Sequence, residues 1–251
     1  KDDPLNFVKF AFPWGMKDTP LEDFKGPRKW QEKILREITI HIARNGTKDL
    51  PEMFRMAVAS GRGIGKSALV SWLILWMLST RLGATIIVTA NTEQQLRSRT
   101  WAELGKWMTL SINSHWFHKT ATTIKPAPWF QEALERDLKI DTGYYYAQAQ
   151  LWSEENPDAF AGIHSSYGVC LIMDEASGIP APIYSVSEGF FTEPTQNRYW
   201  FTFSNPRRNT GPFYDSFHAK KKFWQNLQID SRTVEGTDQK LFQSMIEQYG
   251  E

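Results

Sequence analysis

The chain has 251 residues, a formal net charge of +1, 41% hydrophobic residues and 23% charged residues. These values fit a globular chain with a sizeable core, arranged as one large α/β domain or two small ones, and exclude a strongly basic chain. Positive charge can still gather on one face. The single cysteine, Cys170, excludes an internal disulfide, and its apolar surroundings predict a buried, inert thiol in a reducing compartment.

The first half of the chain alternates between helical and strand patterns. Residues 1–26 mix aromatic residues with proline and glycine, and we expect an irregular arm there. Apolar residues at helical spacing then predict a helix from Pro27 to about Arg44, which Asn45-Gly46 ends. The elements expected next are a buried strand over 53–59, a helix over 67–82, a strand over 84–89 and a helix over 92–110 with Thr92 as its cap.

The second half has a weakly patterned segment followed by clearer strands. Within residues 111–163, only 144–152 alternate enough to predict a strand. Further strands are expected over 169–173, 198–203 and 223–229, and a helix over 237–249. This alternation predicts an α/β fold in which a mostly parallel sheet is sandwiched by helices.

A phosphate-binding loop lies between the expected strand over 53–59 and the helix that follows. Such a loop needs inward-facing backbone N–H groups, a lysine for the outer phosphates and a hydroxyl for Mg²⁺. All are present in Ser60, Gly61, Arg62, Gly63, Ile64, Gly65, Lys66 and Ser67, with Lys66 and Ser67 as the lysine and the metal ligand. The first position is serine where the usual pattern has glycine. We therefore expect ATP and Mg²⁺ as cofactors.

Two acids follow the apolar run Val169–Met173. Hydrolysis of ATP needs a carboxylate near the metal and a group that activates water. The strand would place Asp174 at Mg²⁺ and Glu175 at the attacking water. Arg62, inside the loop, would steady the charge on the γ-phosphate, unless it is a surface arginine paired with an acid.

Several short motifs together resemble the large terminase subunit of tailed bacteriophages. They are residues 160–164 (FAGIH), 174–180 (DEASGIP), 203–206 (FSNP) and 211–214 (GPFY), along with the arginine in the phosphate loop. The resemblance covers nearly the whole chain from Pro27 onward. It implies a P-loop NTPase of the RecA-like, additional-strand type, acting as the ATPase motor that drives viral DNA into a capsid.

The resemblance also implies residue roles that spacing alone does not give. Gln31 matches the family's adenine-recognising glutamine, against the plainer interpretation of an exposed residue at a helix start. Ser204-Asn205 matches the coupling motif that senses the γ-phosphate, against an ordinary turn. The family's arginine supplied by a neighbouring subunit is not found between Phe160 and Cys170, which leaves Arg97, Arg99 and Arg136 unranked.

The expected organisation is an arm over 1–26 and an ATPase domain over 27–251, without the family's nuclease domain and without nuclease activity. The expected partners are double-stranded DNA, the small terminase subunit and the capsid portal protein, with a homo-oligomeric ring when active. Basic runs that could contact DNA are Lys220-Lys221-Lys222, Arg207-Arg208 and Arg97/Arg99. The expected location is the host bacterial cytoplasm, since no stretch is long enough to span a membrane.

Two other functions remain open. One is a helicase-like ATPase that remodels nucleic acid, although no second RecA-like domain is visible. The other is a nucleotide-binding assembly switch with little turnover, against which the second acid, Glu175, argues. The five histidines and Cys170 form no convincing zinc site.

Overall fold

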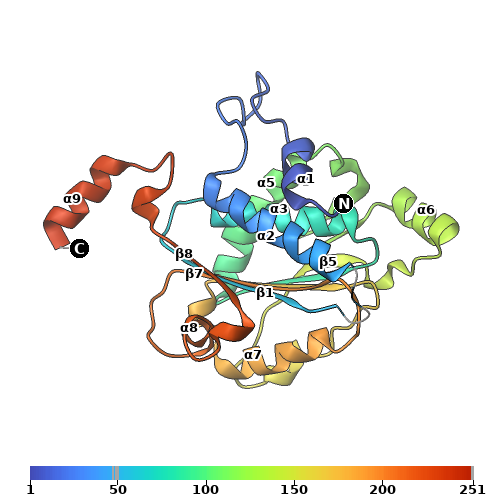
Figure 1. Ribbon diagram of the computed structural model, residues 1–251. Coiled ribbons are helices and arrows are strands. Elements are labelled where there is room, and N and C mark those ends of the chain that lie inside the picture. The colour runs from blue at the N-terminus through green and yellow to red at the C-terminus, as the bar shows by residue number, and fades with distance from the viewer. Residues whose placement is uncertain (47, 49–50, 250–251) are drawn as a thin grey trace.

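The computed structural model describes residues 1–46, 48 and 51–249 (Figure 1). An eight-stranded sheet crosses the middle of the molecule in the order β3-β4-β5-β2-β6-β7-β1-β8. Neighbouring strands from β5 to β8 are parallel, and β3 and β4 form an antiparallel edge. The strands are β1 Phe54–Ser60, β2 Thr85–Ala90, β3 Phe117–Lys119, β4 Thr123–Pro126, β5 Tyr146–Ala149, β6 Val169–Asp174, β7 Arg198–Ser204 and β8 Gln225–Ile229.

Helices cover both faces of this sheet. In Figure 1, α1, α2, α3 and α5 lie above it, α7 and α8 lie below it, and α9 projects from one end. The helices are α1 Pro4–Ala11, α2 Lys29–Asn45, α3 Lys66–Thr80, α4 Glu93–Gln95, α5 Ala102–Leu110, α6 Pro128–Leu138, α7 Ala181–Ser187, α8 Pro212–Phe217 and α9 Gln239–Tyr249. A π-helical segment, η1 Leu96–Trp101, joins α4 to α5.

The central strands are buried on both faces because each faces a separate apolar cluster. In β6, Cys170 and Ile172 join the cluster under α2 and α3, whereas Leu171 and Met173 join the cluster over α7. The continuous apolar run over 169–173 is therefore a central strand of a parallel sheet. Cys170 is fully buried and unbonded, and burial raises the pKa of its thiol, as its sequence context predicted.

The expected fold class is confirmed. Every element expected from the sequence is present, with boundary shifts of a few residues, and Thr92 caps its helix by accepting a hydrogen bond from the Gln95 N–H (3.2 Å). The strand expected over 144–152 is shorter, because residues 142–144 form a 3₁₀ turn before β5 begins. The short elements β3, β4, α6, α7 and α8 were not predicted.

The expectation of an irregular arm over 1–26 was wrong for Pro4–Ala11, which is helical. Asp3 caps this helix by accepting from the Asn6 N–H, and Pro4 occupies the first turn, where proline costs no hydrogen bond. The segment is held on the body by aromatic contacts: the Phe12 ring lies 5.1 Å from Trp107, and the Trp14 ring lies 5.6 Å from Trp72.

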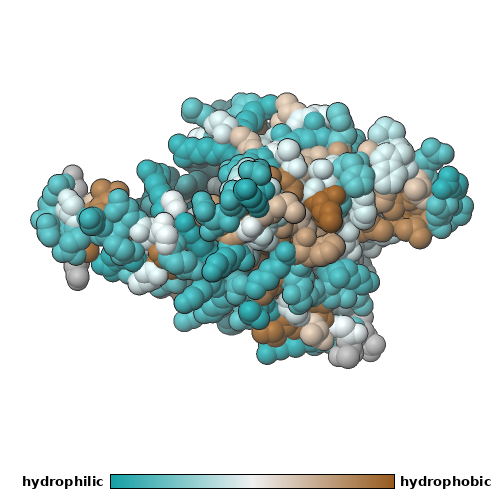
Figure 2. Space-filling model, turned by 90° about the horizontal axis from the view of Figure 1, so that it is seen from above, coloured by the Kyte–Doolittle hydropathy of each residue, from teal (hydrophilic) through white to brown (hydrophobic). Residues whose placement is uncertain are grey.

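The surface is mostly hydrophilic, and its apolar patches are small and separate in the view of Figure 2. The most exposed large apolar side chains are scattered over several elements, for example Phe10, Ile112 and Leu138. Isolated exposed apolar residues of this kind are normal on a globular protein. Among the described residues, no helix combines the length and apolar character needed to cross a membrane.

Candidate nucleotide site

The phosphate loop connects the end of β1 to the start of α3. Gly63 and Gly65 have φ angles of 73° and 92°, in the region that favours glycine, so the loop turns sharply and presents its backbone to the helix N-terminus. Ser60, where the usual pattern has glycine, is buried, and its Oγ accepts from the Lys66 amine (3.2 Å). The serine is therefore an integral part of the loop.

Two side chains at the start of α2 donate hydrogen bonds to backbone carbonyls of the phosphate loop. The Trp30 indole N–H donates to the Ile64 carbonyl (3.1 Å), and the Gln31 amide donates to the Gly65 carbonyl (2.8 Å). Gln31 is 2% exposed, and its side-chain oxygen Oε1 accepts a hydrogen bond from the Arg28 backbone N–H (2.8 Å). Gln31 is thus not the exposed residue of the plainer interpretation. Contact with adenine would require its present hydrogen bonds to rearrange.

Lys66 points back across the loop. Its amine donates to the Gly61 carbonyl (2.5 Å) and lies near the Ser60 backbone and hydroxyl oxygens. Burial lowers the pKa of Lys66, while the carboxylates of Glu175 and Asp174 act in the opposite direction. The positive charge of Arg62 lowers the pKa of Lys66 further. Both cations line the same cavity.

The two acids stand at the end of β6, opposite the loop. Asp174 is almost fully buried; its Oδ1 accepts from the Glu175 N–H (3.0 Å) and its Oδ2 accepts from the Thr100 hydroxyl (2.7 Å). Burial raises the pKa of Asp174, and the Thr100 hydrogen bond opposes that rise. Glu175 has φ 51° and ψ 40°, a left-handed conformation that is costly for a residue with a Cβ. Such strained residues cluster at functional sites.

The loop and the acids enclose a cavity of about 270 Å³. Its walls include Arg62, Lys66, Ser67, Asp174 and Glu175, so five of the residues predicted for catalysis or metal binding come together. Gln31, Ser60, Gly61, Ser204 and Asn205 do not line it. Two wall residues, Gln95 and Glu103, were not singled out from the sequence, and Arg99 was named there only as a candidate for the arginine of a neighbouring subunit or for DNA contact. The three are spaced by four residues, which places them on one helix face.

Ser204 and Asn205 are linked to the segment that follows Glu175. Ser204 Oγ lies 2.8 Å from Ser177 Oγ and accepts from the Ser177 N–H (3.1 Å), while the Ser177 hydroxyl donates to the Asn205 carbonyl (3.2 Å). β7, which carries Ser204, lies between β1 and β6. The Ser204 hydroxyl and the Asn205 backbone carbonyl therefore connect the end of β7 to the turn that follows Glu175.

The residues present fit one Mg²⁺ ion. Mg²⁺ is usually held by one or two carboxylates, substrate phosphates and water, not by a cage of protein ligands. The chain as described contains no cluster of three or more His, Cys, Asp or Glu suited to a metal. Each oxygen of Asp174 accepts one hydrogen bond and keeps a second lone pair, and the Ser67 hydroxyl lines the same cavity.

The arginine candidates separate in the structure. Arg97 pairs with Glu93 (2.7 Å) and Arg136 with Asp137 (2.8 Å). Arg99 lines the cavity between the phosphate loop and the two acids of its own chain, and within the described residues its side chain makes no hydrogen bond or ion pair. Arg207, Arg208 and the lysines over 220–222 are exposed.

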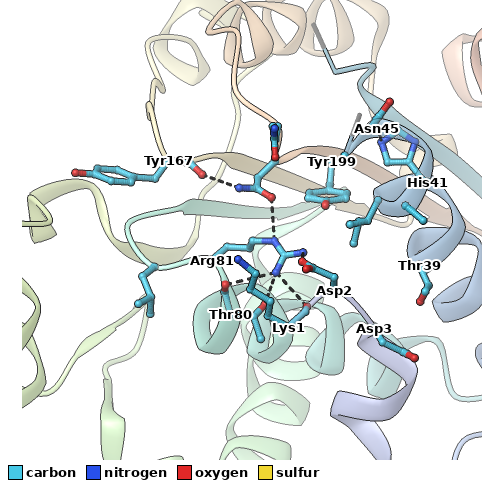
Figure 3. Close-up of a pocket in the computed structure, with 16 residues that line it drawn as sticks. Lys1, Asp2, Asp3, Thr39, His41, Asn45, Thr80, Arg81, Tyr167 and Tyr199 are labelled. Atoms are coloured by element: carbon cyan, nitrogen blue, oxygen red, sulfur yellow. Dashed lines mark hydrogen bonds and ion pairs between the residues drawn. The ribbon is translucent and has the colours of Figure 1, made fainter. Parts of the chain in front are cut away.

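Two larger cavities are also present. One, of about 1180 Å³, lies at the carboxyl ends of β1 and β8, on the other side of the phosphate loop. It is lined by the predicted site residues Ser60, Gly61 and Asn205, and by Arg207, Arg208 and the aromatic face of α8. The other, of about 1090 Å³, contains none of the predicted site residues (Figure 3). There the buried Arg81 donates to Asn197 Oδ1 (2.9 Å), Asp2 Oδ1 (2.9 Å) and the Lys1 carbonyl (3.0 Å). These contacts tie the start of the chain to the body.

Comparisons with known proteins support the resemblance drawn from the sequence. No protein-family model matches the chain. A curated relative, the probable terminase large subunit of Enterobacteria phage P7, is 29% identical over 170 residues, which cover 64% of this chain and 31% of that protein. The chain thus spans about a third of the length of this relative.

Solved structures give the same result for the fold. The large terminase of bacteriophage HK97 matches 98% of this chain and 46% of its own, with a TM-score of 0.58 and 12% identity. A large terminase from a thermophilic bacteriophage, solved with ADP, matches 98% of this chain and 49% of its own (TM-score 0.55, 13% identity). The ATPase domain of the Thermus phage P74-26 large terminase matches 83% of this chain and 87% of its own (TM-score 0.51, 15% identity).

The fold is therefore that of a P-loop NTPase of the kind found in large terminases. β7, which lies between β1 and β6, is the additional strand that the resemblance implied.

Proposed function

We propose that this chain is the ATPase motor of a viral terminase large subunit, which hydrolyses ATP to move double-stranded DNA into a procapsid. The observation that carries the proposal is the cavity between the phosphate loop and Asp174-Glu175, in a fold shared with terminase ATPase domains. We assign residues 27–251 to the ATPase domain and residues 1–26 to an arm on it. No nuclease activity is expected from this part of the protein.

The positions of the cavity residues support the following roles. The loop amides and Lys66 would bind the β- and γ-phosphates, and Arg62 would stabilise charge on the transferred phosphoryl group. Glu175 would orient or deprotonate the attacking water. Mg²⁺, held through Ser67 and Asp174, would neutralise phosphate charge. Ser204-Asn205 would respond to the γ-phosphate through Ser177, and Gln31 would contact adenine after leaving the Gly65 carbonyl.

The partners proposed are those of a packaging motor: double-stranded DNA, a small terminase subunit and a portal protein, in a ring of copies in the host cytoplasm. Binding to DNA would be independent of the DNA sequence, because it would depend on contacts to the phosphates. The logarithm of the DNA-binding constant should fall less steeply with the logarithm of the salt concentration after charge reversal at Lys220, Lys221 and Lys222. The slope should decrease by about one unit for each lysine that contacts phosphate. An unchanged slope and affinity would remove these lysines from the DNA surface.

The decisive experiment is steady-state ATPase activity against protein concentration, with and without double-stranded DNA, for the wild type and Glu175→Ala. Removal of a general base should lower turnover by about 10²- to 10⁴-fold. Glu193→Ala, which removes an exposed carboxylate away from the cavity, is the matched control and should keep full activity. Tight ATP binding without turnover in the wild type under every condition would contradict the motor and favour the assembly switch.

A further inference from the structure

The hydrogen bond between Thr100 and Asp174 joins two buried side chains that are far apart in the sequence. Thr100 is 0% exposed and Asp174 is 9% exposed, and their oxygens lie 2.7 Å apart. A carboxylate can only accept, so the threonine hydroxyl is the donor. This is the one side-chain donor to Asp174 within the part of the chain that the structure describes.

Thr100 lies in η1, where the helix between β2 and α5 is π-helical. π-Helical turns inside α-helices are rare, and they occur frequently at functional sites. β2 pairs with β6 so that Ala90 lies opposite Asp174, which brings the start of this helix beside the acidic turn. The helix then turns Thr100 toward Asp174 while Gln95, Arg99 and Glu103 line the cavity.

We propose that Thr100 is a positioning residue for Asp174, fixing the orientation in which this carboxylate binds the metal of the nucleotide. The inference rests on the proposed nucleotide site. The Thr100 hydroxyl donates to Oδ2 and the Glu175 N–H donates to Oδ1, so the carboxylate group of Asp174 cannot rotate freely. The lone pairs that accept no hydrogen bond therefore keep a fixed direction and are available to the metal. Partners that orient a metal ligand in this way typically change metal affinity by about 10- to 100-fold when removed.

Three variants separate this role from simple packing. Thr100→Val keeps the shape of the side chain and removes the donor, and Thr100→Ser keeps the donor and removes a methyl group. Thr89→Val is the matched control, because Thr89 is also fully buried, lies in neighbouring β2, and has a hydroxyl without a hydrogen-bond partner. Binding of a fluorescent ADP is measured by titration, first in EDTA and then over a range of Mg²⁺ concentrations, alongside the melting temperature.

We expect Thr100→Val to raise the half-saturating Mg²⁺ concentration by about 10-fold or more, with ADP affinity in EDTA unchanged. Thr100→Ser and Thr89→Val should stay within about threefold of the wild type. The inference is overturned if Thr100→Val matches the wild type in Mg²⁺ dependence, or if Thr100→Ser is as impaired as Thr100→Val. A wild type that binds ADP equally well with and without Mg²⁺ also overturns the inference. A wild type that binds no ADP, in EDTA or in Mg²⁺, would instead refute the nucleotide site itself, and the inference with it.

Discussion

The left-handed backbone of Glu175 makes a quantitative prediction about stability and activity. A residue with a Cβ pays about 1–2 kcal/mol in this conformation, and glycine avoids that cost. Glycine also adds about 0.4–1 kcal/mol of chain entropy to the unfolded state. Comparison of Glu175→Gly with Glu175→Ala cancels the loss of the carboxylate and leaves the backbone difference. The glycine variant should be the more stable by about 0.5–1 kcal/mol, although both variants lose turnover.

The assay is urea unfolding together with thermal melting, in which this difference corresponds to about 1–4 °C for a chain of this length. Lys139 gives a matched control, since it is exposed, lies outside the cavity and has φ 56°. Lys139→Gly should exceed Lys139→Ala in stability by a similar amount. If Lys139 shows the difference and Glu175→Ala is at least as stable as Glu175→Gly, the strained conformation of Glu175 is refuted.

Three further predictions concern other parts of the molecule. Arg99→Ala should lower turnover about 10- to 100-fold, as expected for loss of a hydrogen bond to a charged group. Because Arg99 faces its own chain's cavity, mixing Arg99→Ala with Glu175→Ala should restore no activity, and restoration would show that it acts on a neighbour. Burial lowers the pKa of His41 below its ordinary value of about 6.5, with Lys48 and Arg44 assisting and Glu52 opposing. The unfolded chain therefore binds more protons, and the free energy of unfolding should fall as pH drops below about 6.5, by no more than about 1.4 kcal/mol per pH unit. His41→Gln should flatten this slope in urea unfolding at pH 5.5–7.5, and an equal slope would contradict the assignment. Ser204→Ala removes a buried acceptor and should cost about 1–3 kcal/mol of stability. It should leave ADP affinity unchanged, because Ser204 does not line the cavity, and a large loss of affinity would contradict this.

The sequence predicts the parts of the site that are local. The phosphate loop and the pair Asp174-Glu175 each lie within a few residues at the end of a recognisable strand, so chain order alone places them at one edge of a parallel sheet. The long elements were predicted for a related reason. α3 and β6 consist largely of apolar runs, because both are buried on nearly all sides. The short, half-exposed elements β3, β4 and α6 lack such a pattern.

The parts that could not be predicted depend on contacts between distant segments. Thr100 reaches Asp174 only because β2 pairs with β6, and the order of strands in a sheet cannot be predicted from the local sequence. Gln31 reaches the Gly65 carbonyl only because α2 packs against the loop. The spacing of Gln95, Arg99 and Glu103 can be read from the sequence. It indicates a cavity only when it is known that this helix face lies opposite the phosphate loop and the two acids.

The strand order has a consequence for the way the protein folds. β1, which carries the phosphate loop, is flanked by β7 and β8, both from the last part of the described chain. Parallel strands cannot pair through a tight hairpin, and loop closure over such distances slows folding. During synthesis, both edges of β1 stay unpaired until β7 and β8 emerge, which exposes an apolar strand to wrong partners. The phosphate loop is therefore completed late in folding, although its sequence is made early.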